Sequence, residues 1–253
     1  IEIYIKNGAI IEKGVRIGIE SVIVSNYIHL KENSVIGEDT YIQTLSFELG
    51  VMSVIGNKMN VVTRHIKIGD VFFSGNSITI GGGGAFSNNA KLIIGDECLV
   101  SSHCILNTGE GIIIGNRVGL SPHVKLYTHN HWQNELEGYN SNFGPIIIDD
   151  NAYITGDSII VPNVKIGKGS TVFANSTVTK NIQPYTQVCG NPAVVIGKIN
   201  TKLDNKKKNI IIKKILENMY NDKQLINIER NNVTYYEWLD QKSDISTRCF
   251  DCP

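Results

Sequence analysis

Aliphatic residues recur along this chain with a spacing of six. The spacing is clearest at Ile160, Ile166, Val172 and Val178, and it appears again at Ile5, Ile11, Ile17 and Ile23. A period of six matches neither the 3.6-residue repeat of an α-helix nor the two-residue alternation of a strand. It fits a short strand followed by a turn, in which one aliphatic side chain per unit points inward and a glycine or small polar residue lets the chain bend.

The repeat units group into coils. Ile-Gly pairs recur through the first two thirds of the chain, and Gly18, Gly37 and Gly56 are each 19 residues apart. Three six-residue units would make a triangular coil of roughly 18 residues, and stacked coils would share a continuous aliphatic core. We therefore predict an all-β solenoid over residues 1–199.

Two segments interrupt the repeat. Residues 126–144 include the polar and aromatic run HNHWQNELEGYNSNFG, which predicts a protruding loop. Residues 81–89 read GGGGAFSNN. A glycine-rich run can cradle phosphate, but no Gly-Lys-Ser/Thr follows this one. We interpret it as a coil corner or a flexible loop.

The composition changes after Asn200. Residues 201–253 carry ten Lys/Arg and eight Asp/Glu, so the tail is densely charged but nearly balanced. Apolar residues between Ile211 and Met219 fall on one face of a predicted helix, and short strands are expected around 226–228 and 233–238. The sequence thus predicts a C-terminal extension, 200–253, that is helical or α+β. It could cap the solenoid or bind a substrate or partner.

Composition and charge exclude several classes of protein. The chain has 39 Ile and 20 Val against 13 Leu, which favours strands over a helical bundle. Lys+Arg and Asp+Glu are both 24, and this balance argues against a protein that binds nucleic acid or an acidic membrane. No apolar run approaches the roughly 18 residues of a membrane span, and no secretion signal is visible. We expect a cytoplasmic protein without membrane insertion.

The cysteines fit a reducing compartment. There are five, an odd number, and three of them, Cys98, Cys104 and Cys189, are scattered through Ile/Val-rich sequence, as expected of buried thiols. Cys249 and Cys252 have the spacing of a redox or zinc motif, but no second CxxC or histidine pair lies nearby. We assign the cysteines no role.

Histidines concentrate where the repeat stops. His123, His129 and His131 all fall between Pro122 and Trp132, at the base of the predicted loop. A solenoid has few pockets of its own, so its sites are built by loops and by contacts between subunits. Histidine suits a general base there because its pKa is near neutrality. His29 and His65 have no such context, and we read His103 and His123 as hydrogen-bonded coil residues.

The repeat and these motifs resemble the hexapeptide-repeat acyltransferases, in particular the maltose- and galactoside-type O-acetyltransferases. The matching segments are 120–131, 144–146, 152–156, 160–167, 176–182 and Gly190–Ala193. The resemblance covers about residues 94–199. It implies a left-handed parallel β-helix, an exception to the right-handed crossover rule. It also implies acetyl-CoA as co-substrate and a homotrimer with sites between subunits.

The resemblance assigns roles to individual residues. His131 occupies the catalytic position, with His129 as the alternative base, and the backbone N–H of Gly156 would stabilise the oxyanion. Cofactor-binding positions are Gly156, Ala174, Thr179, Lys180 and Pro192. Asn107, Trp132 and Tyr153 are candidates for binding the acceptor. No acyl-enzyme is implied.

The chain departs from this family at three places. Tyr153 stands where the family commonly has Trp, and Trp132 stands where it has Pro. Val194 and Val195 replace a basic residue after the Gly-Asn-Pro-Ala motif. The Trp132 change suggests an altered acceptor pocket in which the indole stacks on a sugar ring. The loss of the basic residue weakens the expected grip on the CoA phosphates.

The leading hypothesis is an acetyl-CoA-dependent O-acetyltransferase acting on a sugar or surface-glycan acceptor. One alternative is an N-acetyltransferase of a nucleotide-linked amino sugar, and another is a non-catalytic solenoid scaffold. His123, His129 and His131 could also hold zinc, as in the γ-type carbonic anhydrases. The Thr179-Lys180 and Gly190–Ala193 motifs favour CoA, so we predict no metal site.

Overall fold

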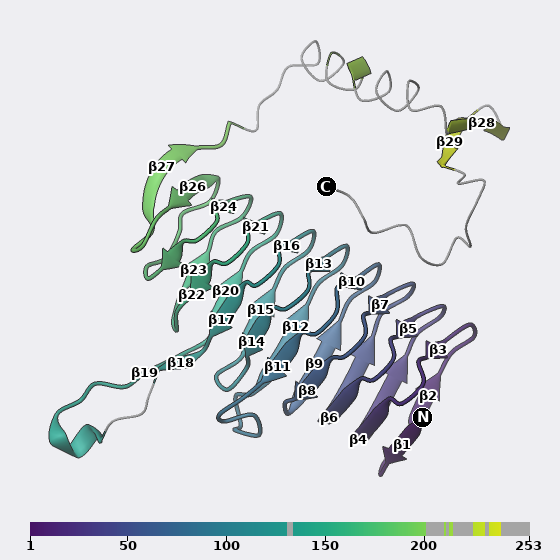
Figure 1. Ribbon diagram of the computed structural model, residues 1–253, viewed down its shortest axis with the longest axis horizontal. Helices are drawn as coiled ribbons and strands as arrows, with labels where there is room; N and C mark the ends of the chain where they lie inside the picture. The colour runs from purple at the N-terminus through teal and green to yellow at the C-terminus, as the bar shows by residue number, and fades with distance from the viewer. Residues whose placement is uncertain (131–133, 201–209, 211–212, 215–224, 231–232, 239–253) are drawn as a thin grey trace. The chain divides into compact units, whose positions relative to one another are not determined.

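The computed structural model describes residues 1–130, 134–200, 210, 213–214, 225–230 and 233–238. It divides the chain into two compact units, Ile1–Ile199 and Asn200–Pro253. In the first unit, strands of two to nine residues stack in parallel, coil upon coil, in chain order (Figure 1). The predicted all-β solenoid is confirmed. The left hand that the resemblance implies stays a prediction.

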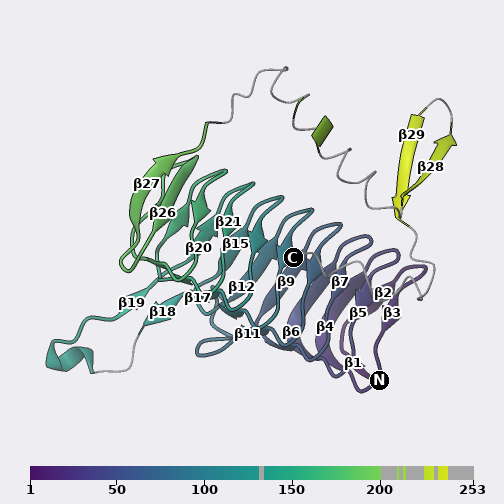
Figure 2. The same cartoon turned by 45° about the horizontal axis from the view of Figure 1, so that its top comes forward.

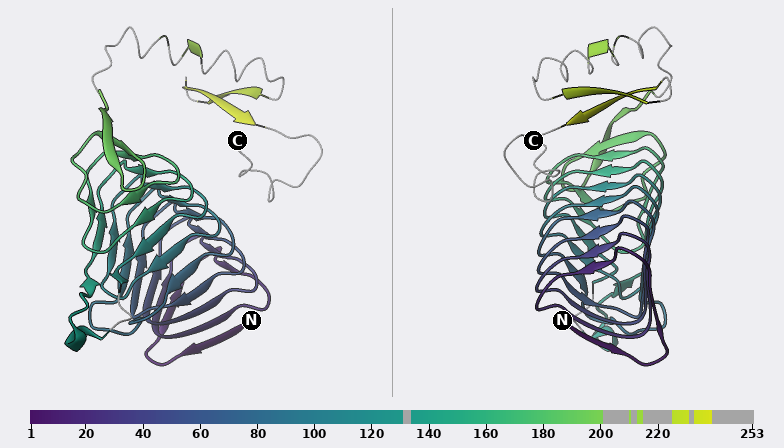
Figure 3. Two further views of the ribbon diagram at one scale, coloured as in Figure 1. Left: turned by 60° about the vertical axis from the view of Figure 1, so that its left-hand side comes forward. Right: turned by 90° about the vertical axis from the view of Figure 1, so that its right-hand side faces the viewer.

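Each coil has three short sides, which stack into three faces (Figure 3). Face 1 and face 2 belong to one sheet because β4 (Val22–Leu30) and β6 (Tyr41–Leu49) run through the corner between them. Face 1 continues with β1 (Glu2–Ile5), β8 (Asn60–Val62), β11 (Thr79–Gly81), β14 (Ile105–Asn107), β17 (Lys125–Tyr127), β22 (Ile159–Ile160) and β25 (Thr177–Val178). Face 2 continues with β2 (Ala9–Ile11), β9 (His65–Ile68), β12 (Lys91–Ile94), β15 (Ile112–Ile114), β20 (Ile146–Ile148) and β23 (Lys165–Ile166).

Face 3 is a separate sheet of ten strands. Its parallel strands are β3 (Arg16–Ile17), β5 (Val35–Ile36), β7 (Val54–Ile55), β10 (Phe73–Ser74), β13 (Leu99–Val100), β16 (Gly119–Leu120), β21 (Tyr153–Ile154), β24 (Thr171–Val172) and β26 (Thr186–Cys189). The last strand, β27 (Val194–Lys198), turns back and pairs antiparallel with β26. This turn ends the parallel stacking at the C-terminal side of the unit (Figure 2).

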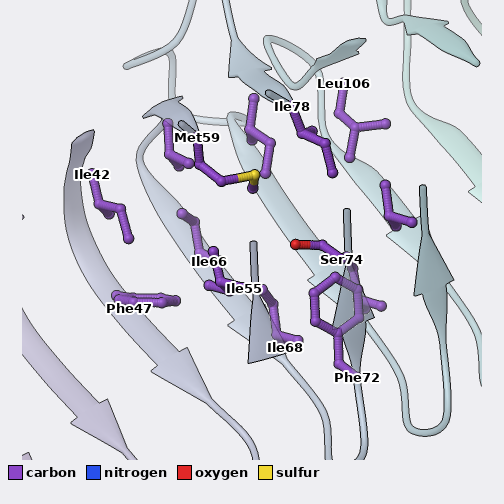
Figure 4. A pocket seen from close by; sticks show the side chains of 14 residues that line it. Ile42, Phe47, Ile55, Met59, Ile66, Ile68, Phe72, Ser74, Ile78 and Leu106 are labelled. Atoms are coloured by element: carbon purple, nitrogen blue, oxygen red, sulfur yellow. The ribbon is translucent and has the colours of Figure 1, made fainter. Parts of the chain in front are cut away.

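The six-residue spacing marks side chains that point into the solenoid. Ile160, Ile166, Val172 and Val178 are all 0% exposed. Each adds its aliphatic surface to one core that runs along the stack, and burial of a side chain of this size contributes about 1.5–3 kcal/mol. Figure 4 shows the same arrangement at an earlier level, where Ile42, Phe47 and Leu106 point into a small apolar space in the interior. That space is part of the core.

Corners are turned by residues in the left-handed region of backbone conformation. Many are Asn, Asp or Glu, but Val71 also adopts a φ of 55°. A β-branched residue is strained there because its side chain crowds the following carbonyl.

Replacing Val71 by asparagine is expected to raise the free energy of unfolding by about 1 kcal/mol, because Asn tolerates this conformation. The thermal midpoint of the variant measures the gain, since the 50% exposed Val71 side chain contributes little to the core. Val195→Asn is the control, because Val195 is 63% exposed and lies in the strand β27, outside the left-handed region. A midpoint that falls equally in both variants would show that Val71 is not strained.

The second unit contains an antiparallel pair of strands, β28 (Leu225–Arg230) and β29 (Val233–Trp238). Strands were expected in this region. Ile210, Lys213 and Lys214 are helical, and the rest of the helix predicted from Ile211 to Met219 lies outside the described residues. Across the described part of the chain, no helix is both long and apolar enough to span a membrane.

Candidate active site

Both interruptions of the repeat emerge at the same corner of the solenoid, between face 1 and face 2. Residues 82–90 connect β11 to β12, and residues 128–145 connect β17 to β20. The coil between them turns the same corner with only residues 108–111, between β14 and β15. We call these three segments together the loop corner. The longer interruption starts after Tyr127, two residues later than predicted, because Leu126 is a fully buried strand residue.

The 128–145 loop projects from the coils (Figure 1). At its base, β18 (His129–Asn130) pairs antiparallel with β19 (Asn142–Phe143). A 3₁₀ helix, η1 (Glu135–Glu137), is capped by Asn134 and ends at Gly138, whose φ is 90°. The polar composition of the loop is therefore accommodated in a hairpin and not in a coil. His131 and Trp132, the predicted base and acceptor-stacking residue, lie outside the described residues.

The tetraglycine run begins the 82–90 loop and passes close to its neighbours. A Cβ on Gly82 would lie 2.7 Å from the side-chain nitrogen of Asn107, and one on Gly83 would lie 3.0 Å from Nε2 of His129. Arg64 holds the far part of the loop by donating to the Phe86 carbonyl and the Asn88 side chain. The run is thus a coil corner, as one interpretation had it, and its missing side chains let other groups approach.

Asn107 occupies an outward register position but is only 9% exposed. Its strand partner Tyr127 is at the equivalent position in the next coil. The Asn107 side-chain oxygen accepts from the Thr128 hydroxyl at 3.0 Å and from the Gly109 N–H at 3.3 Å. Because loops cover it on both sides, Asn107 is fixed inside the loop corner, next to the predicted alternative base.

Buried hydroxyls reinforce this corner. Thr108 donates to the Thr63 hydroxyl at 2.7 Å, and Thr128 accepts from the Glu110 N–H at 3.1 Å. Both Thr108 and Thr128 are fully buried. A buried polar group that loses its partner costs about 1–3 kcal/mol, so these bonds restrict the corner to one arrangement.

His129 is inserted at the centre of the loop corner. Added Cβ atoms would lie 3.0 Å from its Nε2 at Gly83 and 3.2 Å from its Nδ1 at Gly109. Its ring stacks on Phe143 with centroids 6.0 Å apart and planes inclined by 19°. The same Cβ at Gly109 would lie 3.6 Å from the Asn107 side-chain oxygen, so His129 and Asn107 both lie beside Gly109.

Three of the predicted cofactor residues, Gly156, Ala174 and Pro192, lie at a different corner, between face 3 and face 1. Residues 121–123, 155–157 and 173–176 turn this corner in consecutive coils, and we call them the Gly156 corner. Gly156 accepts from Asn175 N–H at 3.0 Å, which stacks Ala174 and its neighbours directly on the Gly156 turn. Gly190 accepts from Thr177 N–H at 3.0 Å. The turn that carries Pro192 therefore extends the same line of residues.

The surface of this line is open. Ala174 and Pro192 are exposed, and a Cβ on Gly156 would meet only the Pro122 carbonyl, at 3.2 Å. Thr179 and Lys180 are exposed at the opposite edge of face 1, where β25 ends and the chain turns toward face 2. They are two to three residues beyond Thr177, which binds the Gly190 carbonyl, and at about 3.3 Å per residue that is about 7–10 Å from Thr177. An elongated ligand that follows Gly156, Ala174 and Pro192 could therefore also meet Lys180.

Tyr153 belongs to the Gly156 side and not to the loop corner. It lies on β21 in face 3, is 46% exposed, and its hydroxyl accepts from Ser121 Oγ at 2.9 Å. Its ring covers Gly119 of the preceding coil. Within one chain, the structure does not bring Tyr153 together with Asn107, although both were predicted to bind the acceptor.

The other histidines have structural partners. His103 and His123 are exposed turn residues whose rings stack with centroids 5.1 Å apart. His29 lies 2.7 Å from Glu12, and this hydrogen bond lowers the pKa of the Glu12 carboxyl. Burial, and then the charges of neighbouring basic residues, lower the pKa of His65. Within the described residues no three His, Cys, Asp or Glu side chains are grouped so as to hold a metal ion.

Cys98 and Cys104 are buried, as predicted, and Cys189 is partly exposed. Burial raises the pKa of the Cys104 thiol to about 11. Since the thiolate is the reactive form, this thiol is held inert at neutral pH. Cys249 and Cys252 lie outside the described residues.

Three residues around His129 were missed at the level of sequence: Gly83, Gly109 and Phe143. A usable signal existed for Gly83, because both breaks in the repeat follow strands of the same face. Counting repeat units would have placed them at one corner. Gly109 and Phe143 carry no such signal, since each is ordinary in its local sequence.

Comparison with known proteins finds relatives that match a little under half of the chain. No family model matches the chain. A putative acetyltransferase of Saccharomyces cerevisiae is 34% identical over 116 residues, covering 45% of this chain and 59% of the relative. Putative acetyltransferases of Schizosaccharomyces pombe (37% over 121 residues) and Staphylococcus aureus strain Mu50 (35% over 124 residues) match similarly.

The chain is similar to putative acetyltransferases. It spans about three fifths of the length of these curated relatives. Among solved structures, a hexapeptide-repeat acetyltransferase of Vibrio cholerae complexed with acetyl coenzyme A is 27% identical, with a TM-score of 0.40, over 46% of this chain and 63% of that chain. The polySia-specific acetyltransferase NeuO is 19% identical, with a TM-score of 0.47, over 82% of this chain and 97% of that chain. Neither TM-score reaches 0.5, so the assignment of the fold is based on the strand pairing within this chain.

Proposed function

We propose that this protein is an acetyl-CoA-dependent O-acetyltransferase of the hexapeptide-repeat class that acts on a sugar-type acceptor. The observation that carries the proposal is the line formed by Gly156, Ala174 and the Pro192 turn along one corner. Residues picked from separate motifs, up to 36 positions apart in the sequence, stack there in consecutive coils. Similarity to putative acetyltransferases over 116–124 residues supports the same assignment.

The proposed chemistry is direct transfer. His131, as a neutral imidazole, takes the proton from an acceptor hydroxyl while the hydroxyl oxygen attacks the thioester carbonyl. The negative charge that develops on the carbonyl oxygen is met by the backbone N–H of Gly156. When the tetrahedral intermediate collapses, the C–S bond breaks and the imidazolium returns its proton to the departing thiolate of CoA. Atoms and charge balance without a covalent enzyme intermediate.

Acetyl-CoA is assigned to the Gly156 corner. The absence of a side chain at Gly156 and the small one at Ala174 let an extended pantetheine lie against the backbone. Pro192 would pack near the adenine, and Lys180 would meet a phosphate as a point charge. With Val194 and Val195 in place of the family's basic residue, Lys180 is the cation on which phosphate binding mainly depends.

A second copy of the chain is needed to complete the site. The loop corner and the Gly156 corner lie at opposite edges of face 1. Thr128 is six positions after Pro122 across that face, which is about 20 Å of extended chain. Reacting atoms must approach to about 3–3.5 Å, so we propose that the base of one subunit serves acetyl-CoA held by the next. A homotrimer provides three equivalent sites of this kind.

Acetyl-CoA is expected to raise the thermal midpoint of the protein, and an acceptor screen should then release free CoA thiol. Binding at 100 times Kd stabilises by about 2.7 kcal/mol, or about 5–11 °C for a chain of this size. The screen compares simple sugars, oligosaccharide fragments and nucleotide-linked amino sugars. Transfer to an amino sugar alone would establish the N-acetyltransferase alternative. An unchanged midpoint would favour the scaffold and contradict the proposal.

A further inference from the structure

Three segments that are far apart in the sequence meet around one imidazole. The tetraglycine run contributes Gly83, the short 108–111 turn contributes Gly109, and the base of the 128–145 loop contributes His129. The Nε2 edge of the ring faces Gly83 and the Nδ1 edge faces Gly109. Both nitrogen-bearing edges of the ring are therefore flanked by glycine backbone.

The fit depends on the absence of side chains. A methyl group on Gly83 would lie 3.0 Å from Nε2 and 3.3 Å from Cε1, closer than about nine in ten such contacts in proteins. A methyl group on Gly109 would lie 3.2 Å from Nδ1 and 2.8 Å from the Gly83 carbonyl. Any side chain at either position must displace the ring or the opposing backbone, because a packed site transmits such changes.

The walls of this slot are themselves fixed. The Ser87 hydroxyl donates to the Gly109 carbonyl and ties the tetraglycine loop to the 108–111 turn. The Gly109 N–H is bound by the Asn107 side chain, which Thr128 also contacts. Phe143 stacks on His129 and is also its strand partner across the hairpin base. The ring thus lies in a slot whose walls are joined to one another by these contacts.

We propose that His129 is a positioning residue whose imidazole locks the 128–145 loop to the tetraglycine loop, and that Gly83 and Gly109 are glycines in order to admit it. This inference rests on the proposed function, because the segment held in place leads two residues later into the proposed base, His131. With glycine backbone against both of its nitrogen edges, the ring holds the two loops together by packing. The proton transfer is left to His131.

A double-mutant cycle tests the lock. Gly83→Ala and His129→Ala are each expected to lower the thermal midpoint by about 2–4 °C. Because both changes disrupt one contact, the double variant should melt no lower than His129→Ala alone. At independent sites, the two decreases in thermal midpoint would instead add. Gly197→Ala is the matched control, since its methyl would meet only the end of the flexible Gln187 side chain at 2.9 Å. Additive losses would overturn the proposal.

Kinetics separate positioning from catalysis. Gly83→Ala and His129→Ala should each lower kcat by about 10–100-fold, because a displacement of about 1 Å can cost that much, and the midpoint shift caused by acetyl-CoA should stay unchanged. His129→Gln should retain the acidic limb of the kcat–pH profile. Loss of all activity in a His129→Gln variant with a normal thermal midpoint would make His129 the base. If the wild type transfers acetyl to no acceptor, the proposed function fails, and the thermal cycle still decides the lock.

Discussion

Replacing His131 by alanine is expected to lower kcat by about 10²–10⁴-fold, the range typical for loss of a general base. The acceptor hydroxyl would keep its proton until late in the attack, so the barrier rises although both substrates remain bound. Acetyl-CoA is assigned to a different corner of the solenoid, around Gly156 and Ala174. Its effect on the thermal midpoint should therefore be the same in the variant and in the wild type.

The pH profile sharpens this test. An imidazole base works only when neutral, so kcat of the wild type should fall as the pH drops below a value near the usual histidine pKa of about 6.5. The His131→Ala variant should lose this acidic limb together with its activity. His129→Gln is the matched control because it also removes an imidazole from the same loop base. A kcat that is unchanged in His131→Ala would refute the assignment of the base.

Shortening Leu126 to alanine is expected to lower the free energy of unfolding by about 2–5 kcal/mol, the cost of a cavity in a packed core. Leu126 is fully buried in β17, between its strand partners Leu106 and Ile160. In a solenoid each coil contacts mainly its neighbours, so the loss should be concentrated locally. Hydrogen exchange should quicken first at the Thr128 and Gly144 amides, which flank the 128–145 loop.

Leu49→Ala provides the comparison for this experiment. Leu49 is equally buried, in β6, four strands away along the sheet order from β17. The Leu49→Ala substitution should lower the free energy of unfolding by a similar amount but leave hydrogen exchange at Thr128 and Gly144 unchanged. In the proposed acetyl transfer, measured well below the melting transition, Leu49→Ala should match the wild type, whereas Leu126→Ala should be less active. Equal activity losses in the two variants would show that the loop does not depend on its own coil.

Much of the fold could be read from the chain because its information is local. Each inward position, such as Ile160 or Val172, needs an aliphatic side chain and each corner needs a residue that can turn, so a period of six appears directly in the sequence. The same locality made 116–124 residues of the chain comparable with other proteins. The break in the period also located the loop that carries the histidines. Its start was predicted at Leu126, which is instead a buried core residue of β17.

The candidate site could be predicted only in part. The motifs containing Gly156, Ala174 and Pro192 were identified from sequence, but their alignment along one corner follows from backbone hydrogen bonds between consecutive coils. Asn107 and His129 were named for separate reasons, and the loops above them bring them together. Tyr153, named with Asn107, lies on another face because the strand β21 fixes its direction.

By itself, the sequence determined the architecture: a repeat of six residues specifies which side chains are buried, and the hydrophobic effect then requires the coils to stack. Only the tertiary structure decided what the interruptions do. The tetraglycine run and the histidine-bearing loop are 45 residues apart, counted from Gly83 to Thr128. They meet because coil stacking superimposes equivalent corners at the spacing of neighbouring strands, about 4.7–4.9 Å. Periodicity gives the positions of the corners along the chain, whereas the fit of His129 between Gly83 and Gly109 depends on contacts of a few ångströms that no pattern of residues encodes.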